Sequence, residues 1–258
     1  MTVYGISLLA VIPIRATPSD KSEMVSQLLF GETYKVLDQK KKWHLIQSDC
    51  DGYEGWIDTA QSTTISASQW NSYTKASHLF LSKPVKALST NDNPNQVVGF
   101  GSTFCTELNT IFPKLGLEFP INDLVEFPSS FEADNMTVYA KMWLGSTYLW
   151  GGKSVFGVDC SGLVQVCAKL SGYKLLRDAS MQATQGKIID FLEETKAGDL
   201  AFFDNEEGTI IHVGILLGDQ KIIHASGKVR IDIIDHHGIY NTDIQKYTHK
   251  LRFFRRLQ

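Results

Sequence analysis

The sequence predicts a multidomain protein in which two small all-β barrels precede an α+β domain. Two observations lead to this fold class. Residues 3–64 and 79–128 contain short runs of strand-forming residues between turn signals. From residue 134 onward, segments with helical spacing come first and strand-like segments follow. A chain of 258 residues is long enough for two or three small domains.

The first barrel is expected over residues 1–64. Turn signals rich in Gly, Pro, Asp and Ser separate its runs of apolar, aromatic and β-branched residues. These runs lie at residues 25–30, 34–37, 43–46 and 55–57. Such a series of short strands is typical of a small barrel.

Residues 65–78 are polar, with Trp70 and Tyr73 as the only large groups, and are interpreted as a connector. Strands are expected again within residues 79–128, and these residues are interpreted as a second small barrel that diverged from the first. The expected strands lie at residues 84–88, 97–104 and 124–127, with a turn of Asn, Asp and Pro at 91–95.

The third domain is expected over residues 129–258. Apolar spacing predicts a helix over 133–144 and another over 161–170, which Ser171 and Gly172 end. Strands are expected at residues 199–203, 210–217, 221–225 and 248–255, the last of them placed to close the sheet. Helices followed by an antiparallel sheet make this domain α+β.

Composition narrows the function classes. The net charge of -3 provides no long-range attraction for nucleic acid or an anionic membrane, so neither is expected as a partner. No apolar stretch approaches the roughly 20 residues of a membrane span. The first 14 residues lack the basic start and cleavage site of a signal peptide. A cytoplasmic location is therefore expected, or a periplasmic or extracellular one if a leader was removed. The oligomeric state is not predicted.

The four cysteines, at positions 50, 105, 160 and 167, show neither a C-x-x-C pair nor zinc-ribbon spacing. Four cysteines in a chain of this length do not make a disulfide scaffold. At least one free thiol is expected, and no metal site is.

The most informative segment is GVDCSGLV at residues 157–164. Asp159 is a good N-cap, which makes Cys160 the first residue of the following helix. The helix N-terminus carries a partial positive charge and unpaired N–H groups. We expect both to stabilise a thiolate and to lower the pKa of Cys160. The same N–H groups are candidate oxyanion donors.

A nucleophilic thiol needs an imidazole, and His212 and His224 lie on adjacent predicted strands around the turn at 218–220. If this turn is a three-residue hairpin loop, Leu217 faces Lys221. Both histidines then point to the same face, one diagonal step apart. The arrangement allows a Cys–His dyad in which the second histidine orients the first.

Each of these residues also has a structural interpretation. Cys160 alone is typical of a small apolar residue at a helix start, and His212 of a hydrogen-bonded sheet residue. Cys167 is expected to pack in the core. A zinc site joining His224 to the histidines at 236–237 has no supporting spacing. The occurrence of Cys160, His212 and His224 in one sequence favours the catalytic interpretation.

Four blocks together closely resemble the NlpC-type cell-wall peptidases. They lie at residues 148–164, 198–203, 211–215 and 223–226. The resemblance implies a papain-like domain without a cofactor, in which Cys160 is the nucleophile, His212 the base and His224 the third polar residue. It also implies that the Tyr148 hydroxyl helps at the oxyanion site. Substrate-binding residues are expected in and beyond the first block, namely Trp150, Asp159, Ser161, Asp178 and Ser180.

Residues 3–64 resemble a bacterial SH3-like domain through RATP at 15–18 and GYEGWI at 52–57. A subgroup with this architecture, the γ-D-glutamyl-L-diamino acid endopeptidases similar to dipeptidyl-peptidase VI, uses the SH3-like domain to wall off the cleft. The resemblance implies that Glu23 and Tyr53 meet the free α-amine of the substrate's L-alanine. A carboxylate and a phenol suit an ammonium and would reject an acylated one. Glu23 as a solvated loop charge remains an alternative.

The function expected is hydrolysis of the γ-D-Glu–diamino acid bond in peptidoglycan-derived peptides, in the setting of murein peptide recycling. Two alternatives stay open. One is another acyl-transfer enzyme on the same fold, an amidase or a transpeptidase. The other is a non-catalytic protein that binds the cell wall through its SH3-like modules.

Overall fold

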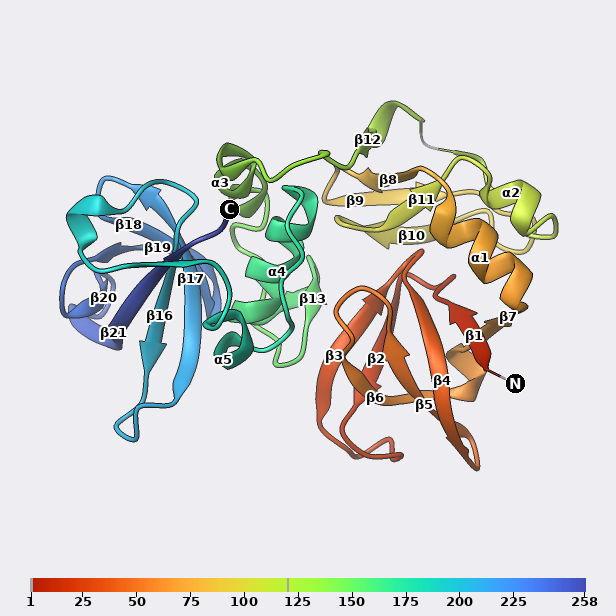
Figure 1. Ribbon diagram of the computed structural model, residues 1–258, viewed down its shortest axis with the longest axis horizontal. Coiled ribbons are helices and arrows are strands. Elements are labelled where there is room, and N and C mark those ends of the chain that lie inside the picture. Colours follow the sequence, from red (N-terminus) through yellow and green to blue (C-terminus); the bar gives the residue numbers. More distant parts are fainter. Residues whose placement is uncertain (1, 120) are drawn as a thin grey trace. The chain divides into compact units, whose positions relative to one another are not determined.

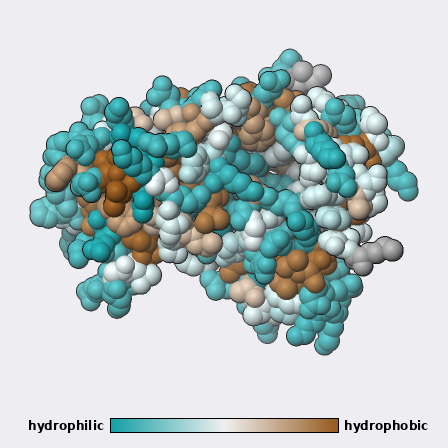
Figure 2. All heavy atoms as spheres, in the orientation of Figure 1, coloured by the Kyte–Doolittle hydropathy of each residue, from teal (hydrophilic) through white to brown (hydrophobic). Residues whose placement is uncertain are grey.

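The computed structural model describes residues 2–119 and 121–258. The chain forms two compact units, drawn in Figure 1. One comprises Met1–Phe127 with Gly151–Val155, and the other comprises Pro128–Trp150 with Phe156–Gln258. Among the described residues, no helix combines the length and apolar character that a membrane crossing requires. The face in Figure 2 is mostly hydrophilic, and its hydrophobic side chains gather in small separate groups.

The N-terminal unit begins with a seven-stranded antiparallel sheet in the order β3-β2-β6-β5-β4-β1-β7. Alternating apolar residues of its strands, including Ile12, Leu28 and Ile57, form a buried core. The four runs predicted as strands lie in β3 to β6. The strands are β1 (Val3–Ile6), β2 (Val11–Arg15), β3 (Met24–Leu29), β4 (Thr33–Lys40), β5 (Trp43–Ser48), β6 (Glu54–Asp58) and β7 (Thr63–Ile65), with a 3₁₀ turn η1 (Thr59–Gln61).

The predicted connector contains a packed helix, α1 (Ala67–Lys75). Ser66 and Gln69 form a capping box at its start, in which each side chain bonds the other's backbone N–H. Tyr73 is buried, and its hydroxyl donates a hydrogen bond to the Gly31 carbonyl at 2.7 Å. The S-x-x-Q pattern at residues 66–69 is a helix-start signal that the connector interpretation did not take into account.

The described residues between 78 and 126 include a three-stranded sheet, β11-β8-β12, and a two-stranded sheet, β10-β9. A turn, where Gly101 has a φ of 83°, breaks the strand expected at 97–104 into β10 and β11. The elements are β8 (His78–Leu81), β9 (Val85–Leu88), β10 (Gln96–Gly99), β11 (Thr103–Cys105), α2 (Leu108–Ile111), η2 (Ile121–Asp123) and β12 (Leu124–Glu126).

One hydrophobic core joins the two regions that were expected to be separate barrels. Ile6 and Phe30 of the first pack in the same cluster as Phe104 and Leu108 of the second. Strand β13 (Lys153–Ser154) also belongs to this unit, where the Lys153 backbone N–H donates to Gln27 Oε1 at 2.7 Å.

The C-terminal unit contains three helices and a seven-stranded antiparallel sheet in the order β15-β21-β16-β17-β18-β19-β20. A further pairing of β21 with β20 closes six of these strands into a barrel, as expected for the last strand. The elements are α3 (Ala133–Lys141), β14 (Gly157–Val158), α4 (Cys160–Leu170), α5 (Ala179–Gln182), β15 (Lys187–Ile189), η3 (Leu192–Glu194), β16 (Leu200–Asp204), β17 (Ile210–Gly218), β18 (Lys221–Ser226), β19 (Lys228–Ile234), β20 (Gly238–Asn241) and β21 (Lys246–Arg256).

Helix α4 is the centre of this unit. Ten of its 11 residues are buried, and it packs against α3, α5, β17 and β18. A helix that is buried on nearly every side needs such surroundings. Both predicted helices and the four predicted strands are confirmed within a few residues at their ends, whereas β15, β19 and β20 were not predicted.

Candidate active site

The N-terminus of α4 has the predicted cap. Asp159 adopts an extended conformation, and its Oδ1 accepts a hydrogen bond from the Gly162 backbone N–H at 2.6 Å. Cys160 is therefore the first residue of the helix, and the residue is only 6% exposed. All four cysteines are free thiols.

A buried arginine fixes this cap. Arg177 is 1% exposed, and its Nη2 and Nη1 reach the two carboxylate oxygens of Asp159 at 2.6 and 3.1 Å. The same Nη1 donates to Ser161 Oγ at 2.8 Å. Asp159 and Ser161, predicted to bind substrate, thus share one cation that holds the residues on both sides of Cys160. The sequence did not single out Arg177.

The thiol of Cys160 lies against β17, because the backbone N–H of Val213 hydrogen-bonds to it. Burial, and then the Asp159 carboxylate, raise the pKa of this thiol to about 12, although N–H groups of Val213 and Ser161 and the charge of Arg177 oppose the rise. The expected lowering of the pKa by the helix tip is wrong for the resting protein. Loss of water around the sulfur outweighs the helix-tip donors.

The hairpin of β17 and β18 brings the two predicted histidines together, although its turn differs from the expectation. Gly218 pairs with Lys221, which leaves a two-residue turn of Asp219 and Gln220, both with positive φ. The predicted three-residue loop is therefore wrong. A bulge at Leu217 takes up the extra residue and keeps the predicted register in the body of the hairpin.

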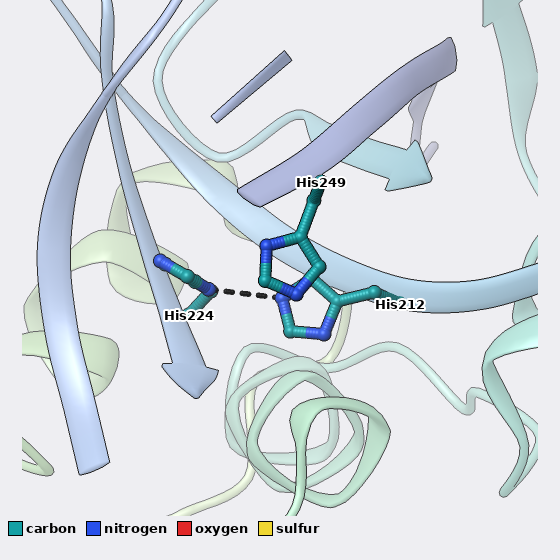
Figure 3. A group of neighbouring side chains, drawn as sticks. All are labelled: His212, His224 and His249. Carbon is teal, nitrogen blue, oxygen red and sulfur yellow. Dashed lines mark hydrogen bonds between the residues drawn. The ribbon is translucent and has the colours of Figure 1, made fainter. Parts of the chain in front are cut away.

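A continuous chain of hydrogen bonds runs from His212 into the sheet. His212 Nε2 and His224 Nδ1 are 2.9 Å apart, as the dashed line in Figure 3 shows. His224 Nε2 lies 3.0 Å from Asp232 Oδ2 on β19. Burial raises the pKa of Asp232, but hydrogen bonds from His224 and Arg230 outweigh this and hold it below its ordinary value.

The charge of Asp232 decides which nitrogens carry protons. An ionised carboxylate only accepts, so His224 donates from Nε2, and as a neutral imidazole it accepts at Nδ1. His212 must then donate from Nε2, which leaves its Nδ1 as an unprotonated acceptor. Burial, followed by the neighbouring His249 and His224, places the pKa of His212 well below its ordinary value. The neutral imidazole is the form that a general base requires.

A third histidine, which the sequence did not indicate, completes the cluster. His249 on β21 stacks on His212, with ring centroids 4.0 Å apart and planes 25° apart. Its Nδ1 lies 2.9 Å from Thr248 Oγ1. Burial, and then His224, lower the pKa of His249 to about 4. The histidines at 236–237 are exposed, and His236 faces Glu193, so the site that would join them to buried His224 does not form here.

The remaining predicted residues of the C-terminal unit differ in their surroundings. Burial and the charges of Cys160 and Asp159 raise the pKa of Tyr148 to about 12, so its hydroxyl keeps the proton that an oxyanion donor needs. Trp150 is 60% exposed. Asp178 is half-buried at the N-cap of α5, and Ser180 is exposed on that helix.

Glu23 and Tyr53 lie in the N-terminal unit. Glu23 is exposed and precedes β3, and its carbonyl accepts a hydrogen bond from the Ala16 N–H. Tyr53 is half-buried in the turn before β6, where its N–H donates to Asp51 Oδ1 at 3.0 Å. Their role in substrate binding stays a prediction.

Comparison with known proteins agrees with this geometry. The NlpC/P60 family matches residues 145–252, and the bacterial dipeptidyl-peptidase SH3 domain matches residues 14–61. A gamma-D-glutamyl-L-lysine dipeptidyl-peptidase of Bacillus subtilis is 32% identical over 224 residues, which are 78% of this chain and 71% of that protein. The protein of the same name from Bacillus cereus is 27% identical and covers 80% and 68%.

Among solved structures, an NlpC/P60 family protein from Bacillus cereus has the same fold. The TM-score is 0.83 at 21% identity, over 98% of this chain and 99% of that one. The length and identity of the match to the Bacillus subtilis relative decide the family. The chain therefore belongs to the NlpC/P60 family, as a cysteine-type peptidase with an N-terminal bacterial SH3 domain.

Proposed function

We propose that this protein hydrolyses the γ-D-glutamyl–L-diamino acid bond of peptidoglycan-derived peptides that begin with a free L-alanine. One observation carries the proposal: the hydrogen-bonded series Asp232–His224–His212 leaves an unprotonated nitrogen on the strand that also contacts the Cys160 thiol. The names of the two Bacillus relatives support the bond type.

In this proposal the thiol is activated when substrate binds. The sulfur of Cys160 attacks the γ-carbonyl carbon while its proton passes to Nδ1 of His212. The resulting imidazolium is stabilised because its Nε2–H still donates to His224, which the Asp232 carboxylate holds. Backbone N–H groups at the tip of α4 and the Tyr148 hydroxyl donate to the oxyanion.

The intermediate collapses by breaking the C–N bond. The proton on His212 goes to the leaving α-amine of the diamino acid, and the acyl group remains on sulfur as a thioester. A water molecule then attacks the thioester carbonyl and gives its proton to the same nitrogen. Breaking the C–S bond releases L-Ala-D-Glu with a free γ-carboxylate and returns the proton to Cys160.

The substrate's two ends supply the specificity in this proposal. Asp159, Ser161, Trp150, Asp178 and Ser180 are the candidates for contact with the D-glutamyl region. The carboxylate of Glu23 and the phenol of Tyr53 have the chemistry to pair with the α-ammonium of L-alanine. A requirement for that free amine suits peptides already cut from the cell wall, so we place the reaction in the recycling of such peptides inside the cell.

Mass spectrometry of digests tests the bond and the amine separately. L-Ala-γ-D-Glu-L-Lys and its diaminopimelate counterpart are each compared with their N-acetylated forms. We expect L-Ala-D-Glu and the free diamino acid from the unblocked peptides alone. Equal cleavage of both forms would reject the amine requirement but leave the peptidase, whereas an intact γ-bond in every digest would reject the proposed reaction.

The same digests separate the transpeptidase alternative. With an added amine acceptor, a transpeptidase joins the L-Ala-D-Glu acyl group to the acceptor, whereas a hydrolase releases the free γ-carboxylate.

The variant Glu23→Gln tests the amine requirement, because it removes one negative charge from the N-terminal unit. We expect a higher KM for the unblocked peptide, because an ammonium loses a charged partner.

We also infer that residues 79–128 form a second SH3-like module that contributes no catalytic group. Short antiparallel strands in two small sheets support this inference. The shared hydrophobic core with the first module supports a structural role. Replacing an exposed residue of this segment, such as Val97, should leave peptide turnover unchanged.

A further inference from the structure

Three histidines that are far apart in sequence gather at one point of the C-terminal barrel. His212 lies on β17, His224 on β18 and His249 on β21. Each offers a ring nitrogen, and the three nitrogens lie within 4.8 Å of one another. Figure 3 shows the His249 ring over that of His212, with His224 at its edge. The catalytic role proposed above uses His212 and His224 but requires nothing of the nitrogens of His249.

The outer nitrogens of two rings are already held. His224 Nε2 is bound to the Asp232 carboxylate at 3.0 Å, and His249 Nδ1 to the Thr248 hydroxyl at 2.9 Å. These contacts leave His224 Nδ1 and His249 Nε2 as possible ligand atoms. A carboxylate behind a histidine is a usual support of a metal ligand, since it fixes the ring and raises its basicity. The Thr248 oxygen can hold the His249 ring by accepting from its Nδ1–H.

We propose that the cluster of His212, His224 and His249 binds one zinc ion, and that the bound ion switches the peptidase off. Three imidazoles with a solvent molecule as the fourth ligand make an ordinary tetrahedral zinc site. Imidazole nitrogen is the ligand type that divalent zinc and cobalt share. The inhibitory part rests on the proposed function, while metal binding by itself does not.

The distances require a small rearrangement. Nitrogens bound to zinc at about 2.0–2.1 Å in a tetrahedron are about 3.3 Å apart. The His212 Nε2 to His224 Nδ1 distance, 2.9 Å, is near that value. The stacked rings of His212 and His249 do not yet direct their lone pairs to one point. His249 is only half-buried, so its side chain can turn to bring Nε2 to the ion.

Bound zinc would inhibit the enzyme because it changes which nitrogen of His212 carries the proton. In the metal-free site, the proton on His212 Nε2 is donated to His224 Nδ1. Zinc takes the lone pairs of both nitrogens, so this hydrogen bond breaks and the proton of His212 moves to Nδ1. Nδ1 then has no lone pair with which to accept the proton of Cys160. Removing the ion reverses the change, with no bond to carbon or sulfur formed.

Cobalt provides a direct probe of the site. The full chain, freed of metal with a chelator, is titrated with Co²⁺ while the visible absorption is followed, and zinc affinity is measured by competition with a chromophoric chelator. We expect one ion per chain, with the intense visible bands of tetrahedral cobalt. Weak bands of an octahedral ion, or no saturable binding below millimolar zinc, would overturn the proposal.

Variants identify the ligands. His249→Phe keeps an aromatic ring for stacking but removes the nitrogen, and we expect at least a tenfold loss of zinc affinity. His249→Gln serves as a second variant if the first does not fold, as judged by circular dichroism. The matched control changes both exposed histidines, His236→Ala with His237→Ala, and should leave the affinity unchanged. Equal affinity in the His249 variants and the wild type would refute the site.

Turnover of the unblocked tripeptide tests inhibition. We expect zinc to stop hydrolysis by the wild type and a chelator to restore it, with His249→Phe needing at least tenfold more zinc. Equal inhibition of both proteins would place the ion on the Cys160 thiol and overturn the proposal. Metal binding without turnover in any condition would instead count against the proposed function, because the spectroscopic site would still be present.

Discussion

Helix α4 holds a buried cysteine at its tip and another two helical turns further along. Cys167, in the second half of the helix, is fully buried, and burial raises the pKa of its thiol, with Trp143 as the polar group that opposes the rise. Cys160, at the tip, is also buried but meets backbone N–H groups, Asp159 and Arg177. Burial is therefore common to both thiols. What distinguishes the tip is its polar surroundings and the strand that carries His212.

The largest expected difference between the two positions is in turnover. Cys160→Ala should abolish hydrolysis of the unblocked tripeptide, because no other group replaces the sulfur that forms the thioester. Cys167→Ala should retain hydrolysis and lower the free energy of unfolding by about 1–2 kcal/mol through the space it leaves. Rates and denaturant unfolding of both variants are measured together. Residual hydrolysis by Cys160→Ala at wild-type rates would show that the tip is not special.

The next largest effect is expected on the free energy of unfolding when Arg177, which holds the cap of α4, is replaced. Arg177→Met leaves the Asp159 carboxylate buried without its bidentate partner, which should cost about 3–5 kcal/mol of unfolding free energy. Arg177→Lys restores the charge but not the paired geometry, so it should lose less. Urea unfolding of the two variants measures both losses. Equal, small losses would mean that the cap of α4 holds without the arginine.

Asp232→Asn removes the charge that orders the histidines while keeping a similar shape. We expect kcat to fall about a hundredfold, within the range that a positioned base contributes, because His224 no longer fixes which nitrogen of His212 carries its proton. KM should change little, since Asp232 is buried behind His224. Full activity of this variant would remove Asp232 from the mechanism.

The last comparison concerns the reactivity of the two thiols. In a metal-free buffer, the rate of iodoacetamide alkylation of Cys160 should rise about tenfold per pH unit from pH 6.5 to 9, because its pKa, raised to about 12, lies above this range and only the thiolate reacts. Cys167 should label only after unfolding. Peptide mass mapping separates the sites. A plateau of Cys160 labelling below pH 7 would indicate a preformed thiolate–imidazolium pair.

Local sequence signals predicted the part of the site that local structure makes. An N-cap residue before an apolar run placed Cys160 at a helix start, and the alternation of strand residues placed His212 and His224 on one face. Asp232 carried a similar signal that was overlooked. It has the same parity as His224, and Gly227 makes the tight turn between their strands.

Other parts depend on contacts between distant segments, which spacing does not reveal. His249 reaches His212 only because β21 closes the barrel beside β20 and β16. The raised pKa of Cys160 likewise depends on how completely the strands cover α4, and a helix-tip argument does not include this. Helix α1 was overlooked because its polar composition hid the one buried tyrosine that anchors it.

The bulge at Leu217 has a consequence for how this hairpin can vary. Successive side chains alternate between the faces of a strand, so one residue added to or lost from a plain hairpin would turn one histidine to the opposite side. A bulge accommodates one extra residue in a strand, so the residues beyond it keep the faces they would have without that residue. Chains with a loop one residue longer or shorter can thus keep the imidazole pair by losing or gaining a bulge, and loop length alone is a poor guide to whether the pair survives.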